Sequence, residues 1–266
     1  MRSLKKRLRD RYGWLPLEEL RNKVVLGHTA LGLGRFERSE VRRLLAGMPG
    51  HERPRAKVAV IVLTYRRPGG LARAVESVLG QTMKDLVLIV VDDAGGQVPE
   101  FPPDPRLHVI SLRHNINVPG VGRNVGIGLT DSDYVAFLDD DNTWEPHHLE
   151  TALTRLDVPD AGARPDAVYT AMRRLMPDGT ERDVLSVPFD RRLAWERCYL
   201  DNNPLVLRRL PSTRFSRLRR TTSVAPKEDW ELVYRFSRRH RVEHIPEPTV
   251  NYTVNPDSYW TPWELS

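Results

Sequence analysis

Polar and acidic residues directly follow three short apolar runs in the first half of the chain. The runs are Val58–Leu63, Leu86–Val91 and Tyr134–Leu138, and the residues after them are Thr64-Tyr65-Arg66-Arg67, Asp92-Asp93 and Asp139-Asp140-Asp141. Taken alone, Asp92 and Asp93 are better explained as turn-forming residues. Successive aspartates repel one another, and a divalent cation that prefers oxygen ligands relieves this repulsion while leaving positions for phosphate oxygens. The cluster at 139–141 therefore predicts a Mn²⁺ or Mg²⁺ site.

The elements that must position these residues alternate between strand and helix. The pattern predicts strands at Val58–Leu63, Leu86–Val91, Leu107–Leu112 and Tyr134–Leu138, and helices at Gly70–Leu79, Val121–Leu129 and Pro146–Leu156. Continuously apolar strands separated by helical crossovers indicate an α/β fold, with a doubly wound, mostly parallel sheet and helices on both faces. Because ligands of such sheets bind beyond the carboxyl ends of the strands, the polar clusters should meet at one edge.

The rest of the chain is organised differently on either side of this region. The pattern of residues 1–54 predicts a helical, basic amino-terminal extension. It ends in Met48–Pro54, a stretch rich in helix-breaking proline and glycine, and residues 55–157 form the α/β half. In residues 158–266 we expect a strand at Ala167–Arg173, a turn at Pro177–Gly179, less regular structure through residue 220, and a helix at Lys227–Arg239. The chain therefore divides into an extension and two halves.

Several motifs occur together in a fixed order. They are Thr64-Tyr65-Arg66-Arg67, Ser77–Thr82, Val91-Asp92-Asp93, Asn117 with Gly122–Gly126, Phe137–Asp141, Lys227–Leu232, Ile245–Pro248 and Tyr252. In order and spacing this set resembles the family 2 glycosyltransferases of the GT-A fold, over roughly residues 58–255. The chain departs from the family at Ala94–Gln97, where relatives usually have Gly-Ser and a further Asp, and at Asn255, where many have histidine.

This resemblance implies transfer of a single sugar, with inversion, from a nucleotide-diphosphate sugar to an acceptor hydroxyl. UDP-sugars are favoured as donors, and dTDP- or GDP-sugars are alternatives. The implied donor-binding residues are Thr64, Tyr65, Arg67, Asp93, Arg123, Asp139 and Asp140, and the implied metal ligands are Asp141 and Asp139. Asp229 is the implied general base, which takes the proton of the acceptor hydroxyl.

The resemblance also assigns tasks to the two halves. Residues 55–157 would bind the nucleotide sugar and residues 158–266 the acceptor, which is a glycan, a lipid-linked molecule or a small molecule. The pathway would be polysaccharide, glycolipid or secondary-metabolite biosynthesis. Two alternatives are a nucleotidyltransferase, whose glycine-rich phosphate loop is missing at Thr64–Arg67, and a non-catalytic nucleotide-sugar binder, which has no need of Asp229.

Two further groups of residues could take part in ligand binding or could have a purely structural role. His147 and His148 fit the first turn of a helix better than a metal site. The six arginines within residues 208–220 fit either a solvated loop of the acceptor half or a clamp on phosphate.

Composition limits partners and location. The 266 residues carry a formal net charge of +6, which suits an anionic ligand. Nucleic acid is not an expected partner, because no zinc-ligand spacing or RNA-binding signature is present. The single cysteine, Cys198, and the lack of a long apolar segment favour the cytoplasm. The sequence does not predict an oligomeric state.

The amino-terminal segment suggests a further contact. Leu4, Leu8, Tyr12 and Leu15 recur at helical spacing among the basic residues of positions 5–11. This pattern predicts peripheral contact of residues 1–20 with the inner membrane face, and the alternative is a helix whose apolar face packs on the catalytic domain or on a second subunit.

Overall fold

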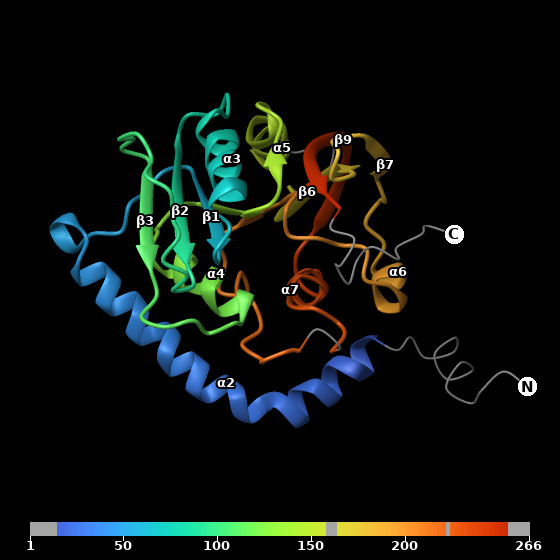
Figure 1. The fold of residues 1–266 in the computed structure, drawn as a ribbon. Coiled ribbons are helices and arrows are strands. Elements are labelled where there is room, and N and C mark those ends of the chain that lie inside the picture. Colours follow the sequence, from blue (N-terminus) through green and yellow to red (C-terminus); the bar gives the residue numbers. More distant parts are fainter. Residues whose placement is uncertain (1–14, 158–163, 222–223, 255–266) are drawn as a thin grey trace, which may run out of the picture.

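The computed structural model describes residues 15–157, 164–221 and 224–254, and Figure 1 shows their arrangement. One mixed sheet of nine strands runs through this part of the chain in the order β3-β2-β1-β4-β8-β6-β9-β5, with β7 paired to β6. Helices cover both faces of the sheet, and a long helix borders the molecule. The predicted α/β fold with a helical amino-terminal extension is confirmed.

The parallel part of the sheet holds the first four strands of the chain. These are β1 (Val58–Thr64), β2 (Leu86–Asp92), β3 (Leu107–Ser111) and β4 (Tyr134–Asp139), paired in parallel. All residues of β2 are buried. Alternate residues of β1 face two different cores, since Ile61 lies in one and Val60 in the other. The strands β1, β2 and β4 are therefore almost entirely apolar, as the sequence indicated, whereas β3 at the edge of the sheet is partly exposed.

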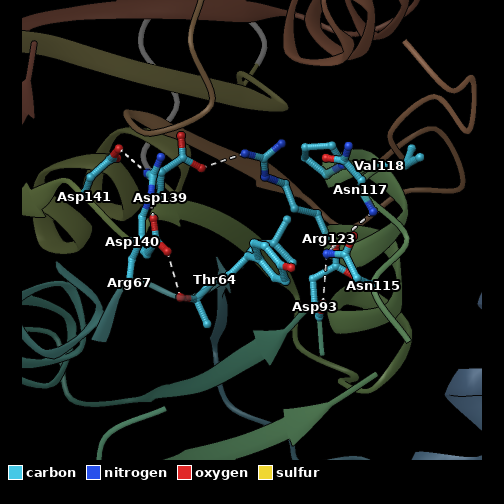
Figure 2. A pocket seen from close by; sticks show the side chains of 13 residues that line it. Thr64, Arg67, Asp93, Asn115, Asn117, Val118, Arg123, Asp139, Asp140 and Asp141 are labelled. Carbon is cyan, nitrogen blue, oxygen red and sulfur yellow. Dashed lines mark hydrogen bonds and ion pairs between the residues drawn. The ribbon is translucent and has the colours of Figure 1, made fainter. Parts of the chain in front are cut away.

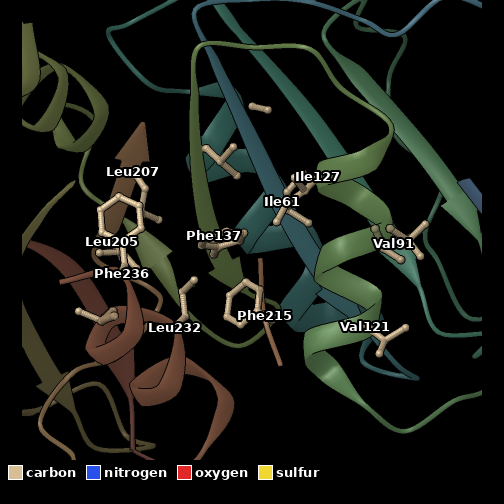
Figure 3. Close-up of a cluster of buried hydrophobic side chains, with 14 of the residues drawn as sticks. Ile61, Val91, Val121, Ile127, Phe137, Leu205, Leu207, Phe215, Leu232 and Phe236 are labelled. Carbon is tan, nitrogen blue, oxygen red and sulfur yellow. The ribbon is translucent and has the colours of Figure 1, made fainter. Parts of the chain in front are cut away.

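Each core is closed by its own helices. The helices α3 (Pro68–Leu79) and α5 (His148–Asp157) bury their apolar sides in one core. The other core, shown in part in Figure 3, is closed by α4 (Pro119–Gly128), α7 (Glu228–Phe236) and the short α6 (Arg191–Glu196). The helix α4 approaches β1 so closely that a Cβ on Gly126 would lie 2.6 Å from Ile61 Cγ2.

Strands from the second half of the chain complete the same sheet. The strand β8 (Leu205–Arg208) pairs antiparallel with β4 and with β6 (Ala167–Leu175), and β9 (Val242–Thr253) pairs parallel with β6. Two short strands, β5 (Thr143–Trp144) and β7 (Glu181–Leu185), extend the sheet. The expectation of less regular structure through residue 220 is thus wrong for β7, α6 and β8. The division of the chain at residues 54 and 157 stays a prediction.

The helix α2 (Leu15–Ala46) is the outermost element along one side of the molecule, and a single 3-10 turn, η1 (Pro49–His51), connects it toward β1 (Figure 1). It packs against α4, so the part of the amino-terminal extension that forms α2 lies on the rest of the protein. Leu4, Leu8 and Tyr12 lie outside the described residues. None of the described helices is long and apolar enough to cross a membrane.

Candidate active site

The polar clusters after β1, β2 and β4 meet in one pocket of about 390 Å³, shown in Figure 2. Its lining includes every residue predicted to bind the donor or a metal, namely Thr64, Tyr65, Arg67, Asp93, Arg123, Asp139, Asp140 and Asp141. Leu63 and residues from the loop before α4, including Asn115 and Asn117, complete the lining. The pocket lies where parallel strands end, which is where ligands of such sheets bind.

Residues at the end of β1 hold two of the aspartates. Thr64 Oγ1 donates to Asp140 Oδ2 at 2.7 Å. Arg67 Nη1 lies 3.2 Å from Asp140 Oδ1 and 2.7 Å from Asp141 Oδ2. Burial and repulsion from Asp139 and Asp140 raise the pKa of Asp141 to about 6. One arginine is therefore too little positive charge to balance this part of the cluster.

Arg123 connects the aspartate cluster to the first turn of α7. Its Nη2 lies 2.6 Å from Asp139 Oδ1, and its Nη1 lies 3.3 Å from Glu228 Oε1. The side chain is only 8% exposed. Burial alone would lower the pKa of Arg123, but the charges of Asp139 and Glu228 raise it above its ordinary value. The guanidinium is thus a fixed positive charge at the centre of the site.

Two asparagines that the sequence analysis did not single out complete the surroundings of Asp139. Asn203 Nδ2 donates to Asp139 Oδ2 at 3.0 Å, and Asn202 Nδ2 donates to Asp139 Oδ1 at 3.3 Å. Burial alone would raise the pKa of Asp139, but Arg123 and the two asparagines lower it. Asp201-Asn202-Asn203-Pro204 has the composition of an ordinary turn, so the sequence carried no signal of this role.

Asp93 fixes the loop that precedes α4. Its Oδ1 accepts from Ile116 N at 2.9 Å, and its Oδ2 accepts from Asn117 N and from Asn115 Nδ2, each at 3.0 Å. A carboxylate has about four acceptor positions, so one remains for a ligand. The predicted contact of Asp93 with the nucleotide base stays a prediction. The neighbouring Asp92 has the turn-forming role, since its Oδ1 accepts from Gly95 N at 2.7 Å.

Asp229 lies buried in the first turn of α7, where its Oδ1 accepts from Trp230 N at 2.7 Å. Burial, together with repulsion from Glu228 and Asp201, raises the pKa of Asp229 well above its ordinary value. Asp229 is not part of the pocket lining, but the contact between Arg123 and Glu228 places its helix turn beside the pocket. A carboxylate with a raised pKa is a stronger base than an ordinary one.

Among the described residues, no group of three or more His, Cys, Asp or Glu side chains has the arrangement of a metal site. Asp139 and Asp140 are engaged by Arg123, the two asparagines, Thr64 and Arg67. Asp141 is 37% exposed at the pocket, and a cation would relieve the repulsion that raises its pKa. Mg²⁺-type sites commonly use one or two carboxylates and complete the shell with substrate phosphates. The residues present fit a metal shared between Asp141 and a diphosphate.

The histidines and the arginines of residues 208–220 that the sequence analysis considered as possible ligand contacts lie outside the pocket. His148 is fully buried, with Nδ1 2.7 Å from Thr249 Oγ1, and burial lowers its pKa to about 3. His148 is thus a neutral core residue that begins α5, in agreement with the sequence interpretation. Within residues 208–220, Arg217 pairs with Glu37 and Arg220 with Glu19 of α2, each at 2.7 Å, so these arginines fix α2 in place of forming a phosphate clamp. Asn255 lies outside the described residues.

Comparison with known proteins decides which family carries this site. Residues 59–191 match the profile of the family described as "Glycosyl transferase family 2". The chain belongs to this family. The predicted family 2 glycosyltransferase is therefore confirmed, and the nucleotidyltransferase alternative is not supported.

This glycosyltransferase is similar in sequence to a curated protein and in fold to two solved structures. The succinoglycan biosynthesis protein ExoW of Rhizobium meliloti (strain 1021) is 36% identical over 113 residues, which are 38% of this chain and 35% of ExoW, so the match spans about a third of that relative. A crystal structure of S. aureus TarS 1–349 in complex with UDP-GlcNAc has a TM-score of 0.58 at 18% identity and covers 79% of this chain and 62% of that one. The mannosyltransferase PcManGT from Pyrobaculum calidifontis, in complex with GDP-Man and Mn²⁺, has a TM-score of 0.55 at 15% identity. The match covers 88% of this chain and 70% of PcManGT.

Proposed function

We propose that this glycosyltransferase moves one sugar from a nucleotide-diphosphate sugar to an acceptor hydroxyl with inversion at the anomeric carbon. The observation that carries the proposal is the meeting of all the predicted donor residues in one pocket, which Arg123 connects to the helix turn that holds Asp229. A UDP-sugar is the favoured donor, supported by the UDP-GlcNAc bound to the similar fold of TarS. The GDP-Man in PcManGT keeps a GDP-sugar as an alternative, beside a dTDP-sugar.

In this proposal each side of the pocket binds one part of the donor. The nucleobase stacks on Tyr65 and donates a ring N–H to the acceptor position that remains on Asp93. The ribose lies at Asp140, whose carboxylate is positioned by hydrogen bonds from Thr64 and Arg67. The diphosphate lies between Asp141 and the amino-terminal end of α4, where helix backbone N–H groups and Arg123 add positive potential.

Asp229 acts as the general base. It takes the proton of the acceptor hydroxyl while that oxygen attacks the anomeric carbon from the face opposite the leaving diphosphate. A single displacement of this kind inverts the stereocentre. The buried surroundings and the neighbouring carboxylates Glu228 and Asp201 raise the pKa of Asp229, which increases its affinity for this proton.

A divalent metal, Mn²⁺ or Mg²⁺, completes the proposed site. Asp141 would hold it together with the diphosphate, and Asp139 would support the site through its fixed position beside Asp141. When bound, the metal supplies Lewis-acid neutralisation of the charge on the departing diphosphate. The Mn²⁺ bound to PcManGT supports this proposal.

The acceptor is proposed to be a glycan, a lipid-linked molecule or a small molecule bound by residues 158–266. Polysaccharide synthesis is supported by the matched relative ExoW, which is a succinoglycan biosynthesis protein. The enzyme is proposed to act in the cytoplasm, with peripheral contact to the membrane. A non-catalytic binder is the second candidate, and turnover separates the two.

The proposal is tested with a panel of UDP-, dTDP- and GDP-sugars. A donor present at about 100 times its Kd adds about 2.7 kcal/mol of stability, or roughly 5–10 °C in Tm for a chain of this size. The shift should require Mn²⁺ or Mg²⁺ and disappear in Asp141→Asn but not in the control Asp133→Asn, whose carboxylate lies away from the pocket. If no sugar nucleotide shifts the Tm, the proposal is wrong. A product that keeps the anomeric configuration of the donor would exclude the direct displacement.

A further inference from the structure

The outward face of α2 carries apolar side chains over its first half and arginines over its second. Val24 is 77% exposed and Leu31 is 72% exposed, and Leu17 and Leu20 are exposed on the same side. Their spacing of three, four and seven residues places them in one stripe. The stripe continues in Arg35, Arg38 and Arg42, which are all exposed.

The acidic residues of α2 point the other way. Glu19, Glu37 and Glu40 are buried and Glu18 is half-buried, whereas all six Lys and Arg residues of the helix are exposed. Glu37 is held by Arg217, Glu19 by Arg220, and Glu40 by Arg113. An ordinary surface helix buries its apolar stripe and exposes charges of both signs. Here ion pairs help to attach the helix and Leu33, Phe36 and Val41 of its second half pack on the core, so the exposed apolar residues of its first half are left for another contact.

We propose that this face of α2 binds a membrane surface that bears anionic headgroups. A helix with Leu and Val on one face and Lys and Arg around it lies in the membrane interface, with its apolar residues at the acyl boundary and its cations among the headgroups. The sequence before α2 has the same charge character, since residues 1–14 contain six Lys and Arg and one Asp. The exposed surface of α2 therefore matches a lipid surface in both polarity and charge.

A second copy of the chain fits this face less well. The apolar half of one α2 could pair with that of another, but Arg35, Arg38 and Arg42 would then face like charges or apolar residues. The helix exposes no carboxylate that could oppose them. Unopposed like charges at an interface disfavour association.

The inner side of the same helix contacts the elements that carry the active site. Lys23 Nζ lies 3.5 Å from Glu231 Oε1 of α7, and Asn22 Nδ2 donates to Ala225 O just before α7 at 2.9 Å. A helix with its side chains is about 10–12 Å wide. A membrane against α2 would therefore lie about one helix diameter from the helix that holds Asp229. This step rests on the proposed function and favours an acceptor at the membrane surface; the membrane binding itself is independent of it.

The test is co-sedimentation of the full chain with vesicles of phosphatidylcholine alone or with 30% phosphatidylglycerol. We expect binding to the anionic vesicles only, weakened by salt because the attraction is screened. The double variant Arg35→Gln/Arg38→Gln should bind about 10-fold or more weakly, since each cation near such a surface contributes on the order of a five-fold change. Leu20→Gln/Val24→Gln should lose binding even at low salt.

Matched control variants replace exposed arginines and an exposed valine on other elements of the surface. Arg73→Gln/Arg192→Gln and Val109→Gln change exposed residues of α3, α6 and β3. These variants should bind anionic vesicles as the parent does. The proposal is overturned if the parent stays in solution with anionic vesicles at low salt, or if the α2 variants bind as well as the controls. It is also overturned if light scattering shows a dimer that only the α2 variants dissociate, because the face then belongs to a second copy.

Discussion

Gly70 lies in the first turn of α3, where the backbone of the aspartate cluster passes closest to it. A Cβ on Gly70 would overlap the carbonyl oxygen of Asp140 and lie 3.3 Å from its carbonyl carbon and 3.6 Å from Asp141 Cα. These are backbone atoms, so they cannot rotate away as the end of a side chain would. Gly70→Ala must therefore push α3 and the turn after β4 apart. Gly69→Ala is the matched control, because a Cβ there meets no atom within 4 Å.

The two variants share the gain in helix propensity, so their difference isolates the contact. Overpacking of this kind costs about 1–3 kcal/mol, which corresponds to roughly 2–12 °C between their Tm values for a chain of this size. A displacement of the aspartates by about 1 Å can lower turnover on the order of 100-fold. Calorimetry and nucleotide release from a sugar nucleotide measure the two effects. Equal Tm values and equal turnover in the two variants would refute the close packing of α3 against Asp140.

Three other substitutions test the site and its supports. Asp229→Asn should keep the thermal shift with donor but lose transfer by about 10²–10⁴-fold. The parent rate should rise with pH through a pKa above the usual carboxyl range, and a flat pH profile would remove Asp229 as the base. Because ionising a carboxyl group with a raised pKa destabilises the folded state, Asp229→Asn should be the more stable protein above that pKa. Glu37→Gln should lose about 1–3 kcal/mol of unfolding free energy in urea through its arginine contacts, with exposed Glu76→Gln unchanged as the control. Asn203→Ala should reduce turnover together with stability, because Asp139 loses two hydrogen bonds; unchanged turnover would contradict the positioning role.

The centre of the parallel sheet could be predicted because its strands β1, β2 and β4 are buried on both faces. Runs such as Leu86–Val91 then contain no polar residue, and the first polar residue marks the strand end. The ends of parallel strands must meet, so the position of Asp139–Asp141 beside Thr64 followed from topology alone. The strands β5 and β8 have only two and four residues, too few for a period to emerge, and their partners are distant in the sequence.

The surroundings of the site were harder to predict than its strand ends. Asn202 and Asn203 act through a loop whose place against Asp139 depends on β8 joining β4. The orientation of α2 could not be read from its pattern, because the helix buries Glu19 and Glu37 and exposes Leu20. The arginines that bind Glu19 and Glu37 lie about 200 residues away in the sequence, and a local pattern holds no information about them.

The ion pairs of α2 also set an order of events during synthesis. Glu37 and Arg217 are separated by 180 residues, and Glu19 and Arg220 by 201. At about 5–20 residues per second, the ribosome makes the helix roughly 10–40 s before the arginines that hold it. Contacts this far apart in sequence also slow folding, because a long loop must close first. During that interval α2 has neither its arginine partners nor the finished sheet, so the newly made segment offers leucines and unpaired glutamates to whatever chaperone or membrane is nearby. The helix α2, which begins the described part of the chain, is thus among the last elements to reach its final place.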